Sequence, residues 1–149
     1  MTNEFRGSAV IGRPIDEVFA FVADGTNDPK FSPRVQKIEK VTEGPIGVGT
    51  IFESSVKDAG LKSGRRFELT TFDAPTTIRW TERSKNMITV PDGGYDLEDL
   101  GDGTTRLTIH NTFEGHGLGK LLLRFALKSA IKDAPAFAGR IKAAVEAAG

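Results

Sequence analysis

One carboxylate stands out among the few residues that could carry out chemistry. Glu82 follows Trp80 by two positions in the strand-like segment Thr77–Arg83, so both side chains should lie on the same face of a sheet. Desolvation beside the indole would favour the protonated carboxyl, which could then act as a general acid or base. The alternative is a position at the rim of the sheet, where Glu82 is solvated or paired with Arg65 on the neighbouring strand.

The two histidines do not complete a catalytic or metal site. His110 alternates with Ile109 and Asn111, so we expect it at the surface, facing away from any pocket. His116 lies between two glycines, and a contact with a ligand is the alternative to an ordinary loop residue. Neither histidine has an evident Ser partner or convergent metal ligands, and the absence of cysteine excludes thiolate catalysis and cysteine-bound metals. We therefore expect no metal and no cofactor.

Composition limits the classes of function. The chain has 149 residues, with 20 basic and 20 acidic side chains, and this balance gives no reason to expect nucleic acid as a partner. The length suits one domain, residues 1–149. There is no apolar run of about 20 residues and no signal-like apolar segment near the start, so we expect no integral membrane contact and a cytoplasmic location.

Alternating apolar and polar residues predict antiparallel strands that would position these groups. One hairpin should place Phe72 opposite Thr77 and Leu69 opposite Trp80. A second hairpin, turning at Gly101–Gly103, should place Leu97 opposite Leu107, Tyr95 opposite Ile109 and Glu98 opposite Arg106. Between them, the segment Pro91–Gly94 predicts a bulge or break in the strand.

Two helical segments flank the strands. Pro14 begins a short helix near the start, and a helical pattern from Leu118 onward continues through Pro135, giving a helix of roughly 30 residues that must cross a whole sheet. We expect the Leu123–Ile131 stripe of this helix to pack on the sheet, with Leu122, Phe125 and Ser129 facing a cavity. Lys120, Arg124, Lys128 and Lys132 form a basic stripe. That stripe is either a solvated helix face or a surface for an anionic partner or membrane headgroups.

One face of the predicted sheet should be concave and apolar. A filled core is the plain interpretation of such a face. Polar groups on the same face, from Ser54, Glu82, Asn111 and the Tyr95 hydroxyl, favour a cavity instead, because buried polar groups need partners or a ligand. The residues expected to contact a ligand are Phe31, Phe52, Ser54, Val56, Phe67, Leu69, Trp80, Tyr95, Leu97, Ile109, Asn111, Phe113, Leu122, Phe125 and Ser129.

The order of these elements resembles a known superfamily. The segments Ile11–Phe19, Gly44–Thr50 and Gly101–Thr104 are similar to those of the START and pollen-allergen (SRPBCC) superfamily, most of all its polyketide cyclase/dehydrase branch, although Arg13 stands where that branch usually has Ala. The resemblance implies an α+β helix-grip fold, in which a seven-stranded antiparallel curved sheet wraps around a long C-terminal helix and two short helices follow the first strand. It also implies a deep pocket between sheet and helix. Members of the superfamily differ widely in function, so the fold alone does not fix it.

Three functions are compatible with these observations. The first is binding of a hydrophobic or aromatic small molecule in the cavity between the sheet and the C-terminal helix. The alternative is a cofactor-independent, cyclase- or dehydratase-like enzyme, in which Glu82 is the acid or base and Asn111 and Tyr95 hold a substrate oxygen. The third is a protein-interaction or co-chaperone module that uses the basic helix.

Overall fold

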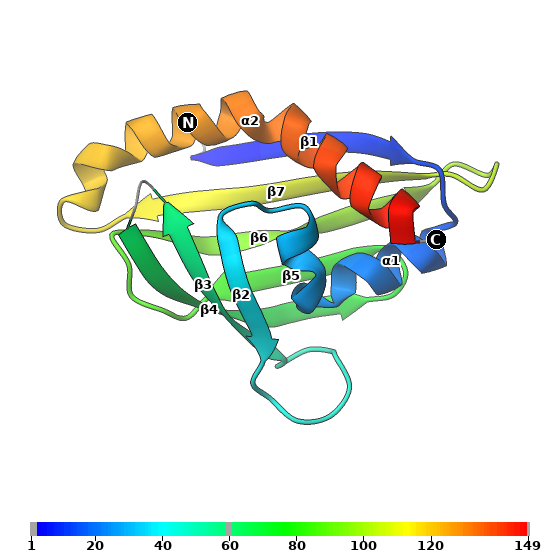
Figure 1. The fold of residues 1–149 in the computed structure, drawn as a ribbon, viewed down its shortest axis with the longest axis horizontal. Helices are drawn as coiled ribbons and strands as arrows, with labels where there is room; N and C mark the ends of the chain where they lie inside the picture. The colour runs from blue at the N-terminus through cyan, green and yellow to red at the C-terminus, as the bar shows by residue number, and fades with distance from the viewer. Residues whose placement is uncertain (1–2, 59–60, 149) are drawn as a thin grey trace.

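Seven antiparallel strands form one curved sheet, and a long C-terminal helix runs across it (Figure 1). The computed structural model describes residues 3–58 and 61–148. Along the sheet the strand order is β1-β7-β6-β5-β4-β3-β2. In chain order the elements are β1 (Glu4–Ile11), α1 (Ile15–Ala23), the 3-10 helix η1 (Gly25–Lys30), β2 (Val35–Lys40), β3 (Ile51–Asp58), β4 (Leu61–Asp73), β5 (Thr77–Glu82), β6 (Ile88–Asp99), β7 (Thr105–Gly115) and α2 (Gly119–Ala148). The predicted helix-grip architecture is confirmed.

The β6–β7 hairpin has the predicted register. Leu97 lies opposite Leu107 and Tyr95 lies opposite Ile109. On the other face, Arg106 pairs with Glu98 at 2.7 Å. Pairing with β7 shifts between Thr89 and Asp92, next to the segment predicted to form a bulge. The alternation along these strands therefore places one row of apolar side chains on the concave face of the sheet.

The β4–β5 hairpin has the predicted register only at the end away from its turn. Leu69 lies opposite Trp80 as predicted, but Phe72 lies opposite Ile78 instead of Thr77. The cause is a bulge between Leu69 and Thr71, which adds one residue to β4. The strands can consequently pair up to Asp73 and Thr77, leaving a turn one residue shorter than predicted.

The C-terminal half of α2 packs closely on the sheet. Its buried stripe consists of Ala134, Ala138, Ile141 and Val145, at steps of three and four residues. Gly7 on β1 permits this approach, because a Cβ atom there would lie only 2.4 Å from the backbone oxygen of Ala134. Figure 1 shows α2 continuing past Pro135 as one curved helix.

The prediction that the Leu123–Ile131 stripe packs on the sheet was wrong, because the buried stripe of α2 lies further along the helix. Leu123 and Leu127 are half-buried and Ile131 is exposed. The reason is that only the small residues Ala134 and Ala138 let the helix axis come close to the sheet. Residues of α2 before Ala134 instead line the cavity described below. No helix within residues 3–58 and 61–148 is long and apolar enough to span a membrane.

Candidate functional site

A cavity of about 860 Å³ lies between the concave face of the sheet, η1 and the middle of α2. Aromatic side chains form much of its wall, among them Phe52, Phe67, Trp80, Phe113 and Phe137. Helix α2 contributes Ala126, Ser129, Ala130, Lys132, Asp133, Phe137 and Arg140. Small residues at 126, 129 and 130 leave space that longer side chains would fill.

Most of the residues predicted to contact a ligand line this cavity. They are Phe31, Phe52, Ser54, Val56, Phe67, Leu69, Trp80, Tyr95, Ile109, Asn111, Phe113 and Ser129. Three others lie elsewhere. Leu97 is buried in the core, and Leu122 and Phe125 are exposed near the N-terminal end of α2. Leu122 and Phe125 each lie four residues before a lining residue, Ala126 and Ser129, so they share that side of the helix but precede the part of α2 that lines the cavity.

Glu82 does not line the cavity, and its carboxylate is fully enclosed by hydrogen-bond donors. Oε1 accepts from Arg65 Nη1 at 3.0 Å and from the backbone N–H of Val90 at 2.9 Å. Oε2 accepts from Ser84 Oγ at 2.6 Å and from Asn86 Nδ2 at 2.8 Å. The side chain has no exposed surface. Pairing with Arg65 agrees with the second interpretation of Glu82, but the carboxylate is buried and not solvated.

Arg65 links the buried Glu82 carboxylate to the cavity. Its guanidinium also donates to the backbone oxygen of Ile88 at 3.2 Å, and both Arg65 and Ile88 line the cavity wall. The geometry therefore gives Glu82 a positioning role: it fixes Arg65 and the chain between β5 and β6. All of its acceptor positions are used in doing so.

Asn111, Trp80 and Tyr95 form a polar group on an otherwise apolar wall. The indole Nε1–H of Trp80 donates to Asn111 Oδ1 at 2.9 Å. The rings of Trp80 and Tyr95 meet edge to face, with centroids 5.1 Å apart. Gly93 makes room for this arrangement, since a Cβ atom there would lie 1.9 Å from Asn111 Oδ1.

Asp28 on η1 is a cavity residue that the sequence analysis missed. Its carboxyl group lines the cavity and receives no hydrogen bond from the part of the chain that the structure describes. Burial, reinforced by the negative charge of Asp24, raises the pKa of Asp28 to about 7. Burial, and then the charge of Asp28, raise the pKa of Tyr95 well above its ordinary value. Two groups whose protonated forms are favoured by burial, Asp28 and Tyr95, therefore line the same cavity.

Nothing in the sequence distinguishes Asp28 from an ordinary loop residue. It lies in Asn27-Asp28-Pro29, a run typical of a turn that ends a helix. Its burial arises only because η1 folds against the sheet, with Gly25 so close to Phe52 that a Cβ atom would lie 2.9 Å from the ring.

Two charged residues of the lining, Arg140 and Asp133, are paired with each other. Arg140 Nη2 donates to Asp133 Oδ2 at 2.8 Å, and Arg140 Nε donates to the backbone oxygen of Phe31 at 3.0 Å. The Arg140 guanidinium also lies over the Phe137 ring, 5.2 Å from its centroid. These contacts connect α2 to the end of η1 and close one side of the cavity.

Neither histidine belongs to the cavity lining. His110 faces away from it as predicted, but the expectation of a surface side chain was wrong, because the ring is buried. Burial, followed by the charges of Arg79 and Arg6, lowers the pKa of His110. His116 is exposed, with Nε2 2.8 Å from Thr89 Oγ1. Within the described ranges no three His, Asp or Glu side chains converge as a metal site would require.

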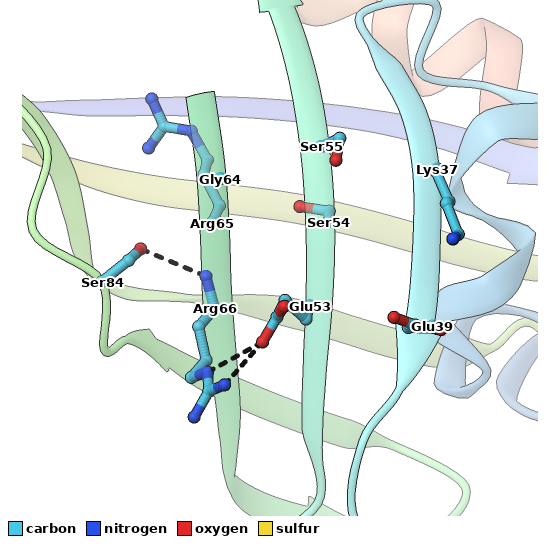
Figure 2. Close-up of a pocket in the computed structure, with 9 residues that line it drawn as sticks. All are labelled: Lys37, Glu39, Glu53, Ser54, Ser55, Gly64, Arg65, Arg66 and Ser84. Carbon is cyan, nitrogen blue, oxygen red and sulfur yellow. Dashed lines mark hydrogen bonds and ion pairs between the residues drawn. The ribbon is translucent and has the colours of Figure 1, made fainter. Parts of the chain in front are cut away.

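A second, smaller depression of about 280 Å³ crosses β2, β3 and β4 (Figure 2). Some of its polar groups bind one another. Arg66 donates through Nη2 to Glu53 Oε2 at 2.6 Å, and its backbone N–H donates to Ser84 Oγ at 3.1 Å. The larger cavity, with its apolar wall and unbonded Asp28 carboxyl, is therefore the better candidate for a site.

Comparison with known proteins agrees with this geometry. The family model described as polyketide cyclase / dehydrase and lipid transport matches residues 2–146. No curated protein matches the chain.

Solved structures of similar fold cover nearly the whole chain. The Zhui aromatase/cyclase from Streptomyces sp. R1128 is 16% identical, with a TM-score of 0.78 over 96% of this chain and 93% of that one. A protein from Thermus thermophilus is 20% identical, with a TM-score of 0.79 over 98% of this chain and 99% of that one. A START superfamily protein from Mycobacterium smegmatis is 12% identical, with a TM-score of 0.72 over 97% and 95%. At these identities the similarity demonstrates a common fold.

Proposed function

The chain belongs to the polyketide cyclase/dehydrase and lipid transport family, and from this premise we propose that it binds a hydrophobic, ring-containing small molecule in the cavity under α2. The observation that carries the proposal is the cavity of about 860 Å³ itself. Ligand pockets typically have volumes of about 300–1,000 Å³, with mostly apolar walls and a few placed polar groups.

The positions of the polar groups suggest how such a ligand is oriented. Phe52, Phe67 and Phe113 offer ring contacts, which suit an aromatic or polycyclic body. Tyr95, and Asp28 in its protonated form, can donate a hydrogen bond, since burial favours the protonated form of each. We therefore expect a ligand with a carbonyl or hydroxyl oxygen at the end that contacts these two residues.

Filling the cavity should abolish this binding. Ala130→Phe places a ring in the cavity, whereas Ala143→Phe adds the same ring at an exposed position of α2 outside it. The fluorescent probe is N-phenyl-1-naphthylamine, and energy transfer from Trp80, the only tryptophan of the chain, reports its binding. We expect one saturable site in the wild type and in Ala143→Phe, and binding at least about tenfold weaker in Ala130→Phe.

Equal affinity in Ala130→Phe and the wild type would place the probe outside the cavity and contradict the proposal. The same conclusion would follow if the two Phe variants lost affinity equally. Urea denaturation of all three proteins establishes that each is folded.

A second candidate function, acid–base catalysis without a cofactor, is favoured by Asp28. A carboxyl with its pKa near 7 inside an apolar cavity is suited to proton transfer, whereas every acceptor position of Glu82 is occupied. Asp28→Asn separates the two functions. It should keep binding of the naphthylamine probe but reduce proton abstraction from 5-nitrobenzisoxazole, a general probe for a carboxylate base, by at least about tenfold. Unchanged turnover in this variant would exclude Asp28 as the base.

A further inference from the structure

A contiguous apolar patch is exposed at the N-terminal end of α2. Leu118, Leu121, Leu122 and Phe125 are 70%, 73%, 45% and 70% exposed. Their spacing of three and four residues places all four on one face of the helix. Single exposed leucines are ordinary on protein surfaces, but a contiguous cluster marks a contact site. We call these four residues the α2 apolar patch.

Unpaired cations lie beside the α2 apolar patch. Residues 118–132 include Lys120, Arg124, Lys128 and Lys132 and contain no Asp or Glu. Within residues 3–58 and 61–148, no ion pair or hydrogen bond involves the side chains of Lys120, Arg124 or Lys128. Lys120 is in the first turn of α2, where the helix dipole disfavours a positive charge. Within the described residues, the charges of Lys120, Arg124 and Lys128 are therefore not neutralised by an acidic partner.

The patch adjoins the cavity. Ala126 and Ser129 line the cavity, and each lies one helical turn or less from Phe125 or Leu122 along α2. Lys132 also lines it, so the basic stripe reaches the cavity wall. A partner that contacts the α2 apolar patch would therefore lie next to the cavity.

We propose that the N-terminal half of α2 docks on an anionic lipid surface, with the α2 apolar patch in the headgroup region and Lys120, Arg124 and Lys128 against the lipid phosphates. Charge complementarity and the amphipathic arrangement identify this occupant: an apolar face flanked by cations is typical of a helix that lies in a membrane interface. Because the chain as a whole has no net charge, the attraction is local to this helix. The proposal does not depend on the cavity ligand, since docking involves exposed residues of α2 that do not line the cavity.

Vesicle sedimentation of the whole, ligand-free protein tests the docking surface. The probes are phosphatidylcholine vesicles with and without about 30% phosphatidylserine. We expect the wild type to bind only the anionic vesicles. Leu121→Ser with Phe125→Ser should weaken binding at least about tenfold. Replacing Lys120, Arg124 and Lys128 by Gln should weaken it at least about tenfold as well, since each cation contributes roughly fivefold.

Matched controls come from β2 and the loop that follows it. Val48, in the loop between β2 and β3, is as exposed as Phe125, and Figure 1 shows this loop far from α2. Val48→Ser and Lys37→Gln should bind anionic vesicles like the wild type. Failure of the folded wild type to bind, equal binding to neutral vesicles, or equal loss in the controls would overturn the proposal. So would self-association through the patch without vesicle binding, measured by light scattering.

Discussion

Asp28→Asn should raise the free energy of unfolding by about 2–4 kcal/mol at pH 8 and leave it almost unchanged at pH 4. The physical reason is the cost of a negative charge at a buried position in a mostly apolar cavity. The ordinary pKa of this carboxyl is 3.8, and burial together with Asp24 raises it to about 7 in the folded protein. An amide in its place removes that charge with almost no change of shape.

The sign of the pH dependence follows from proton binding. Between pH 3.8 and about 7 the folded protein keeps the Asp28 proton whereas the unfolded chain has lost it. The unfolded state therefore binds fewer protons, and the contribution of Asp28 to stability falls as pH rises through this window. Below pH 3.8 both states are protonated and the wild type carries no penalty; above about pH 7 the penalty is complete.

Urea denaturation at pH 4 and pH 8 measures this difference between wild type and variant. Asp92→Asn is the matched control, because Asp92 is exposed and should change stability by less than about 0.5 kcal/mol at either pH. A gain of the same size at both pH values would contradict the account. A loss of stability at pH 8 would show that Asp28 has a charged partner.

Glu82→Gln should lower the free energy of unfolding by about 3 kcal/mol. Gln has one carbonyl oxygen and one amide nitrogen, and the nitrogen cannot accept the two hydrogen bonds that one oxygen of Glu82 receives. The substitution also leaves Arg65 without its ionic partner at a site where the side chain of Glu82 is fully buried.

Glu53→Gln provides the comparison for this effect. Glu53 also pairs with an arginine, Arg66, but both side chains are about half exposed, so its loss should cost less than about 1 kcal/mol. Urea denaturation of both variants compares the buried and the exposed pair directly. Similar small costs for Glu82→Gln and Glu53→Gln would mean that the Arg65–Glu82 network does not hold the wall of the cavity.

The sheet could be predicted from sequence where strand alternation and turn chemistry agree. Tyr95 and Leu97 alternate with charged residues, and a loop of three residues with glycines at both ends sets their pairing with Ile109 and Leu107. These short-range signals also placed Trp80, Ile109 and Asn111 on one face, and all three line the cavity.

Other features depend on contacts between distant segments. The close approach of Gly7 and Ala134 determines which face of α2 packs on the sheet. These residues are 127 positions apart, so helical periodicity alone does not predict their contact. The bulge in β4 between Leu69 and Thr71 contains no glycine or proline that would have predicted it. Strand alternation predicts which side of the sheet His110 faces but not how deeply it is buried, so it was expected at the surface. Its neighbours on β1 and β6 bury it.

The central claim is that a small molecule enters the cavity and contacts the wall around Trp80. The indole N–H of Trp80 gives a single NMR cross-peak, since the chain has one tryptophan, and this N–H is bonded to Asn111 at 2.9 Å. Titrating N-phenyl-1-naphthylamine into the wild type should shift that cross-peak to saturation, and the same titration of Ala130→Phe should leave it in place. Saturable binding of the probe to the wild type with no change in the Trp80 indole resonance would contradict the account.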